Sequence, residues 1–268
     1  MKSRPTALLV TPVLPNPYGF GLSRRAWNWA MELSREHELF TIVVPRGKWA
    51  SAGFADVPGK VEIVDAVQSP LPPHFGDWLN PASSMRQAFR AALPKTAPDR
   101  IVIFRFYLHP LASLFPRGWR ECIEMDCDDW ESLTRRSLAW MEFSRGRLWG
   151  AFATFTGSKL YASLERRFLP RYRRVHFAAQ EDVAAFRSIT PGTDVAEMPN
   201  RIALAPQEVL PHSGLLPPRL LFVGTFSWLP NTDAVLWIAR KVAPLLRRRF
   251  PRFVSRSLAS SRRRVSAF

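Results

Sequence analysis

The feature that most constrains the fold is a short apolar run that leads, through a glycine, into a helical pattern within residues 219–250. Residues 220–223 are of strand type, and Gly224 closes the run with a residue that tolerates a sharp turn. Asn231 is expected to cap the following helix, which Pro244 should kink or interrupt. A strand that feeds a helix across a glycine-bearing loop is the first half of a β–α–β unit.

The amino-terminal residues show the same pattern. Residues 7–11 predict a strand, and the loop 12–22 is too rich in proline and glycine for regular structure. Ser23 is expected to cap a helix over residues 24–35, and residues 39–44 predict a second strand. The two strands should therefore be parallel and joined by a right-handed crossover.

The rest of the chain continues this alternation, so the predicted fold class is α/β with a Rossmann-like parallel sheet. Further strands are predicted at 61–64, 101–104, 121–125, 174–178 and 195–198, and further helices at 82–93 and 159–167. A chain of 268 residues has room for one large domain or two modest ones.

The net charge of +16 is unevenly distributed, because residues 240–268 contain ten Arg and Lys residues and no acidic residue. A specific nucleic-acid binder is expected to spread its basic residues over a folded face with aromatic residues between them, so no specific nucleic acid is predicted as a partner. The mildly basic body suits anionic ligands such as nucleotide diphosphates, or peripheral contact with an anionic membrane.

The location predicted from the sequence is the cytoplasm. No apolar run approaches the roughly 20 residues of a membrane span, and the first apolar stretch reads as a strand rather than a signal peptide. Cys122 and Cys127 do not form a disulfide framework, which fits a reducing compartment.

Gly19 and Gly21 lie at the first strand-to-helix turn, where main-chain amides can approach phosphate. A plain tight turn explains them equally well. Arg24 occupies the position of the third glycine of a dinucleotide fingerprint, and residues 44–46 lack the acid that would hold a ribose. A nicotinamide-dependent oxidoreductase is therefore the weaker alternative.

Two further places carry polar groups at the ends of predicted strands. His109 follows the strand at 101–104, where open α/β sheets bind ligands, and we expect it to share one cleft with the glycine loop. Residues 126–132 include Asp128 and Asp129, which could bind a metal, act as an acid–base pair or cap a helix. The segment has no glycine-turned calcium loop and no nearby histidine, which weighs against a metal site.

Several segments resemble family 4 glycosyltransferases of the GT-B fold, over residues 6 to about 251. Residues 220–251 are similar to the opening of that family's second domain, and residues 121–136, ECIEMDCDDWESLTRR, are similar to an Asp-x-Asp-Asp-x-Glu-Ser segment. Residues 199–202 resemble the family's Pro-Asn-Gly-Ile crossing, with Arg201 in place of glycine. The loop with Gly19 and Gly21, which is followed by Arg24 and a predicted helix, also resembles the family's glycine-rich loop.

The resemblance implies a Rossmann-like acceptor domain at 1–202, a linker at 203–218 and the first βα unit of a nucleotide-sugar domain at 219–251. It implies transfer of a sugar from a nucleotide-sugar donor to a saccharide or lipid-linked acceptor, as in polysaccharide biosynthesis, with retention and without metal or other cofactor. His109 would be catalytic. Donor or acceptor contacts are implied for Gly19, Gly21, Arg24, Asp128, Asp129 and Gly224.

Residues 252–268 are expected to be an aberrant basic tail, from a frameshift or other truncation. This serine- and arginine-rich run shows no hydrophobic periodicity and should leave the strand at 220–223 without sheet neighbours. The family's basic pair for the diphosphate and its paired glutamates have no counterpart, so we expect an inactive chain. A basic nucleic-acid-binding protein is the second alternative, and it rests only on this tail.

Overall fold

The computed structural model describes residues 4–45, 56–65, 67–72, 75–201, 219–226, 228–250 and 253–259. The chain divides into two compact units. One unit comprises Met1–Arg136 and Phe152–Leu204, and the other comprises Ser137–Ala151 and Ala205–Phe268. The predicted linker at 203–218 and the last nine residues, 260–268, lie outside the described residues.

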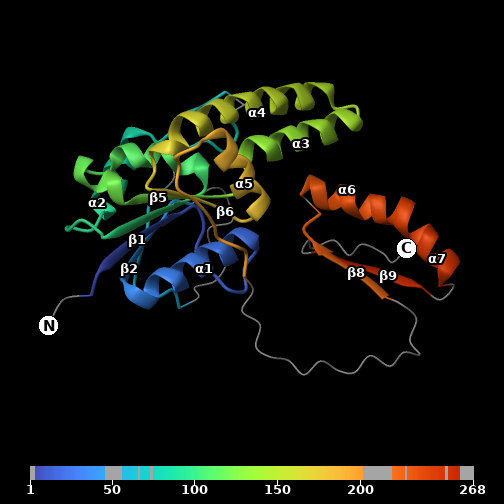
Figure 1. Cartoon of the computed structure of the whole chain (residues 1–268), viewed down its shortest axis with the longest axis horizontal. Helices are drawn as coiled ribbons and strands as arrows, with labels where there is room; N and C mark the ends of the chain where they lie inside the picture. The colour runs from blue at the N-terminus through green and yellow to red at the C-terminus, as the bar shows by residue number, and fades with distance from the viewer. Residues whose placement is uncertain are drawn as a thin grey trace. The chain divides into compact units, whose positions relative to one another are not determined.

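The first unit contains a seven-stranded sheet in the order β3-β2-β1-β4-β5-β6-β7, in which all neighbouring strands are parallel (Figure 1). The strands are β1 (Thr6–Thr11), β2 (Glu38–Val43), β3 (Lys60–Ile63), β4 (Arg100–Phe104), β5 (Ile123–Asp128), β6 (Arg174–Phe177) and β7 (Val195–Glu197). The strand order reverses between β1 and β4, which defines the switch point of a doubly wound sheet. The predicted α/β class and the parallel pairing of the first two strands are confirmed.

Helices and 3₁₀ segments connect the strands. They are α1 (Gly21–Glu36), α2 (Ser83–Ala92), α3 (Glu131–Ser144), α4 (Leu148–Phe168), α5 (Gln180–Ile189) and the 3₁₀ segments η3 (Phe106–Leu114), η4 (Arg117–Cys122) and η5 (Leu169–Arg171). The expected cap at Ser23 is wrong, because α1 begins at Gly21, three residues before the predicted start, with Phe20 at the N-cap position and no side chain capping it.

The two faces of the sheet follow from the alternation of side chains along each strand. Ala7 and Leu9 of β1 pack with Trp29 and the other buried residues of α1. Leu8 and Val10 point to the other face, where the core includes residues of α2, α5 and the 3₁₀ segment η3. Figure 1 shows α1 on one side of the sheet and α2 and α5 on the other.

The second unit contains a pair of parallel strands, β8 (Arg219–Gly224) and β9 (Val254–Ala259). The expectation that the first of these strands lacks sheet neighbours is wrong. An isolated strand would leave its main-chain N–H and C=O groups unpaired, and β9 pairs with it along its whole length, from Arg219 opposite Val254 to Gly224 opposite Ala259.

The crossover between these strands is helical throughout most of its length. It consists of α6 (Leu229–Trp237), a π-helical turn η6 (Ile238–Val242) and α7 (Ala243–Arg249). The predicted interruption at Pro244 takes the form of the π turn just before it, after which α7 begins with this proline in its first turn. Asn231 lies inside α6, and Trp228 is at the N-cap position, so the predicted cap is wrong.

Candidate functional site

The carboxyl ends of β1 and β4 flank the switch point of the sheet, where doubly wound folds bind ligands. The loop after β1 folds back through a hydrogen bond from the Gly19 N–H to the Asn16 carbonyl, 3.2 Å. A side chain at Gly19 would place its Cβ 2.6 Å from Cβ of Ser23, so this position requires glycine. Gly21 begins α1, and a Cβ there would meet nothing within 4 Å.

Two neighbouring residues at this edge have unusual main-chain conformations. Arg105 follows β4 with a φ of 80°, and Asp128 ends β5 with a φ of 62°. Among the described residues they are the non-glycine residues with positive φ. The Nη1 atom of Arg105 lies 3.0 Å from Oδ2 of Asp128. Strained residues of this kind are found at functional sites, where surrounding contacts hold them in place.

Further carboxylates surround the buried guanidinium of Arg105. Its Nη2 atom lies 2.9 Å from Oε2 of Glu131, and its Nη1 atom lies 3.6 Å from Oδ2 of Asp129. Burial acts to lower the pKa of Arg105, but the attraction of Glu131 and the other carboxylates outweighs it and raises the pKa. Its Nε is buried and has no hydrogen-bond partner among the described residues.

Burial raises the pKa of Asp128, and the positive charges of Arg105 and then Arg25 oppose that shift. Asp129, in contrast, is exposed, with 57% of its side-chain surface accessible. The predicted acidic pair therefore separates into two kinds of group. Asp128 is fixed inside the edge of the sheet, and Asp129 faces solvent beside it.

Arg25 is the main residue at this site that the sequence interpretation missed. Its Nε and Nη2 atoms donate to the two carboxylate oxygens of Asp126, at 2.7 and 2.6 Å, and the Trp29 indole N–H donates to the same carboxylate at 2.6 Å. Arg25 also donates to the Met198 carbonyl at 2.7 Å. Arg25 and Asp126 side chains are 1% and 0% exposed.

The sequence did contain a signal for this pair. Arg25 lies four residues before Trp29 and next to Ala26, so it falls on the buried stripe that α1 has in the structure. A charged residue on a buried stripe needs a partner of opposite charge. The acid that supplies it, Asp126, is the first member of the acidic segment already singled out.

A second ion pair lies on the same face of β5. Glu124 accepts hydrogen bonds from Arg100, at 2.9 and 2.8 Å, and its Oε2 lies 2.8 Å from Nε2 of His176. Burial acts to raise the pKa of Glu124, but the hydrogen bonds from His176 and Arg100 outweigh it and lower the pKa to about 2. On this face of the sheet, side-chain hydrogen bonds of Glu124 therefore link β5 to β4 and β6, in addition to the apolar packing.

The remaining predicted residues fall in three separate places. Arg24 is exposed on the first turn of α1, near the glycine loop. Gly224 ends β8 in the second unit, where a Cβ would meet Nδ2 of Asn231 at 2.9 Å and the Phe222 ring at 3.0 Å. Glycine is needed there so that Asn231 can donate to the Thr225 carbonyl at 3.0 Å.

His109 does not lie with the glycine loop. Its ring centroid is 4.1 Å from that of Phe168, and its Nδ1 lies 2.6 Å from the Tyr172 hydroxyl. These partners belong to the face of the sheet opposite α1. The expectation of one cleft for His109 and Gly19 is therefore wrong, because the 3₁₀ segment after β4 turns the chain back over that face.

Within the described parts of the chain, no group of three or more His, Cys, Asp or Glu residues is placed to hold a metal ion. No helix of the described residues is long and apolar enough to span a membrane.

Two solved structures of glycosyltransferases share similarity of fold with this chain. One is a complex between 3,4-dichloroaniline and a UDP-glucosyltransferase from Polygonum tinctorium, an enzyme described as capable of glucosylating indoxyl. Its TM-score is 0.45 at 11% identity, over 84% of this chain and 59% of that one. The other is the glycotransferase of kitacinnamycin, with a TM-score of 0.44 at 15% identity, over 97% of this chain and 67% of that one. No family model matches the chain, and no curated protein sequence matches it.

Proposed function

We propose that this chain is part of a GT-B glycosyltransferase similar to family 4, which transfers a sugar from a nucleotide-sugar to a saccharide or lipid-linked acceptor. The observation that carries the proposal is the switch-point edge of the sheet. The glycine loop after β1 and the strained pair of Arg105 and Asp128 lie at the carboxyl ends of strands in this parallel sheet. Segments that resemble the family contain the glycine loop and Asp128.

The glycine loop and the start of α1 are suited to the donor diphosphate. No side chain caps the helix, no acidic residue lies in its first turn, and its N-terminus carries partial positive charge. The open space at Gly21 lets a ligand approach the main chain. Exposed Arg24 would add a positive charge that stabilises the leaving diphosphate, as a metal-independent, retaining transfer requires.

Asp128 and Arg105 are assigned to positioning rather than to contact with substrate. Asp128 is buried, the Arg105 side chain is only 11% exposed, and the two are paired, so they fix the turn that presents Asp129 at the surface. The exposed Asp129 carboxylate would accept a hydrogen bond from an acceptor hydroxyl. The catalytic role of His109 and contact with an anionic membrane stay predictions, because this arrangement does not depend on either.

We expect the 268-residue chain to bind nucleotide-sugars weakly and to show no turnover. The family's basic pair and paired glutamates, which hold most of the donor, have no counterpart in it. Gly224 lies in the second unit, which corresponds to the start of the family's donor domain. Its proposed contact with the donor would form in that domain. Any measured turnover that disappears in a His109→Ala variant would contradict this expectation and support His109 as the catalytic residue.

The test is a ¹H–¹⁵N NMR titration of the full chain with uridine diphosphate, with NADH as a parallel ligand. The expected result is millimolar binding, with shifts in the loop 12–22 and near Asp129. Gly21→Ala and Arg24→Ala should weaken binding several-fold without lowering Tm. Gly118→Ala, where a Cβ also meets nothing within 4 Å, and exposed Arg90→Ala are matched controls.

Shifts that avoid the edge, or equal losses in the two control variants, would contradict the proposal. Tighter binding of NADH at the same edge would favour the oxidoreductase alternative. Salt-dependent retention of DNA by the full chain, absent from a chain that ends at Phe250, would confine nucleic-acid binding to the basic tail.

A further inference from the structure

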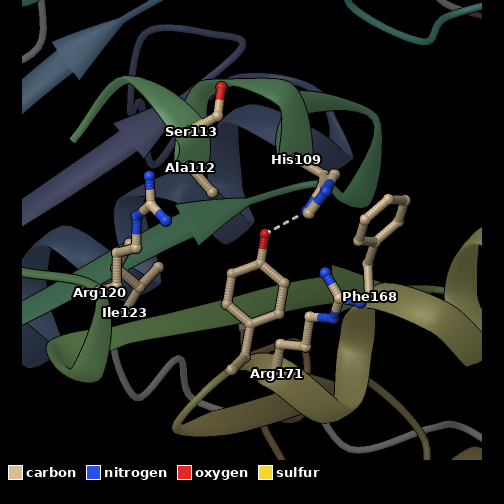
Figure 2. A pocket seen from close by; sticks show the side chains of 8 residues that line it. His109, Ala112, Ser113, Arg120, Ile123, Phe168 and Arg171 are labelled. Carbon is tan, nitrogen blue, oxygen red and sulfur yellow. Dashed lines mark hydrogen bonds between the residues drawn. The ribbon is translucent and has the colours of Figure 1, made fainter. Parts of the chain in front are cut away.

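A pocket on the opposite face of the sheet from α1 is not needed for the arrangement proposed for transfer. Figure 2 shows it from close by. Its volume is about 220 Å³. It lies at the amino end of β5 and β6, since Ile123 is the first residue of β5 and Tyr172 precedes β6. The lining residues are His109, Ala112, Ser113, Arg120, Ile123, Phe168, Arg171 and Tyr172.

The charge in this pocket comes from two arginines. Figure 2 shows Arg120 and Arg171 on different sides of it, and none of the lining residues is acidic. Neither arginine takes part in any ion pair that the described residues form. Two arginines that line a common pocket with no carboxylate in its lining favour a bound anion.

The other polar groups of the pocket add no negative charge. Burial, assisted by the positive charge of Arg171, lowers the pKa of His109 to about 4, so the imidazole is neutral at pH 7. Burial also raises the pKa of Tyr172 well above its ordinary value, so the phenol keeps its proton. The hydrogen bond between them is therefore one between neutral groups.

The remaining lining is apolar except for Ser113, whose hydroxyl donates to the Pro110 carbonyl at 2.7 Å. Ile123 is 2% exposed, and the Phe168 ring packs against His109 at a centroid distance of 4.1 Å. Cζ of Arg171 lies 5.3 Å from the centroid of the Phe168 ring, which orients this guanidinium before any ligand arrives. A fitting ligand would thus present an apolar body as well as a charge.

We propose that this pocket binds a small organic anion, whose carboxylate or phosphate pairs with Arg120 and Arg171 while its apolar body contacts Phe168 and Ile123. The site lies at the amino edge of the strands, away from the carboxyl edge assigned to glycosyl transfer. The proposal does not depend on the transfer function. An anion bound here would connect η4, just before β5, with η5, just before β6.

The experiment is isothermal titration of the full chain with phenyl phosphate, benzoate, inorganic phosphate and benzyl alcohol, with NMR shifts to locate the ligand. We expect phenyl phosphate or benzoate to bind. The ligand that binds more tightly indicates whether the pocket prefers a phosphate or a carboxylate. Inorganic phosphate and benzyl alcohol should bind at least tenfold more weakly. Shifts should include Ala112, Ser113 and the His109 ring.

The double variant Arg120→Gln/Arg171→Gln should lose at least tenfold in affinity. Its matched control is Arg117→Gln/Arg173→Gln, which removes the same charge from exposed neighbours that do not line the pocket. Because all four side chains are exposed, each double variant should keep its Tm. The absence of binding, an equal loss in the control, or inorganic phosphate binding as tightly as phenyl phosphate would overturn the proposal.

Discussion

The arginines at the two edges of the parallel sheet differ in their partners. Around the carboxyl edge, Arg25 and Arg105 are buried and pair with Asp126, Asp128 and Glu131 at distances of 2.6–3.3 Å. At the amino edge, Arg120 and Arg171 line a pocket that contains no carboxylate. Arginine thus has a structural role at the carboxyl edge, whereas at the amino edge it is open to a ligand.

The difference indicates how to distinguish structural from ligand-binding arginines in such a sheet. A buried guanidinium that is already neutralised by carboxylates has little attraction left for an anion, and removing its partner leaves an uncompensated charge. An exposed guanidinium without a partner contributes little to stability and keeps its charge for a ligand. The predictions below test this contrast from the largest expected effect to the smallest.

The largest effect is expected at Asp126. An Asp126→Ala variant leaves the guanidinium of Arg25 buried without its main partner, and it should lower the free energy of unfolding by roughly 3–5 kcal/mol. Urea denaturation followed by circular dichroism measures this. The control is Glu62→Ala, which breaks the exposed pair with Lys60 and should cost at most about 1 kcal/mol. Equal losses in the two variants would contradict the contrast.

Glu124 should dominate the acid sensitivity of the same region. Its folded-state pKa of about 2 lies below its ordinary value of 4.5. The stability it contributes is therefore fully present above its unfolded-state pKa and is lost as the pH falls from about 4.5 through 2. A Glu124→Gln variant should flatten the curve of unfolding free energy against pH in that window. A curve that keeps the wild-type slope there would rule out this role.

The positive φ of Asp128 leads to a prediction with a smaller expected effect. Asp128→Gly and Asp128→Ala both lose the ion pair with Arg105, but only alanine must then adopt a left-handed conformation. The glycine variant should be more stable than the alanine variant by about 1–2 kcal/mol. At exposed Asp194, where φ is not positive, Asp194→Gly should not be more stable than Asp194→Ala. Thermal unfolding of the four variants tests this.

The smallest effect is expected at the amino edge. Arg120→Ala and Arg171→Ala should each change the free energy of unfolding by less than about 0.5 kcal/mol in the absence of ligand, as exposed substitutions usually do. Chemical denaturation at low ionic strength is the measurement. A loss above 2 kcal/mol in either variant would show that the arginine has an essential partner within the protein.

Local patterns predicted much of the sheet. The apolar runs at 7–11, 39–44 and 101–104 were identified because a parallel strand buried on both faces needs continuous apolar sequence. Helix starts were less predictable. Ser23 and Asn231 are good capping residues, yet Phe20 and Trp228 hold the N-cap positions, and no side chain caps either helix.

Long-range pairing explains what the sequence could not predict. The partner of Arg25 is 101 residues away in the chain, and periodicity carries no information on such a pair. His109 follows a strand end, but the 3₁₀ segment redirects it, and that turn has no strong sequence signal. Residues 254–259 lack hydrophobic periodicity, yet the unpaired edge of β8 makes pairing favourable there.

The most direct test of the central contrast is an NMR spectrum of the arginine Nε–Hε groups, recorded with and without phenyl phosphate. In the free chain, the buried groups of Arg25 and Arg105 should exchange slowly with water, and those of Arg120 and Arg171 should exchange fast. Saturating ligand should slow and shift only the Arg120 and Arg171 signals. Slow exchange at the amino edge before ligand is added, or ligand-induced shifts at Arg25 and Arg105 instead, would contradict the account.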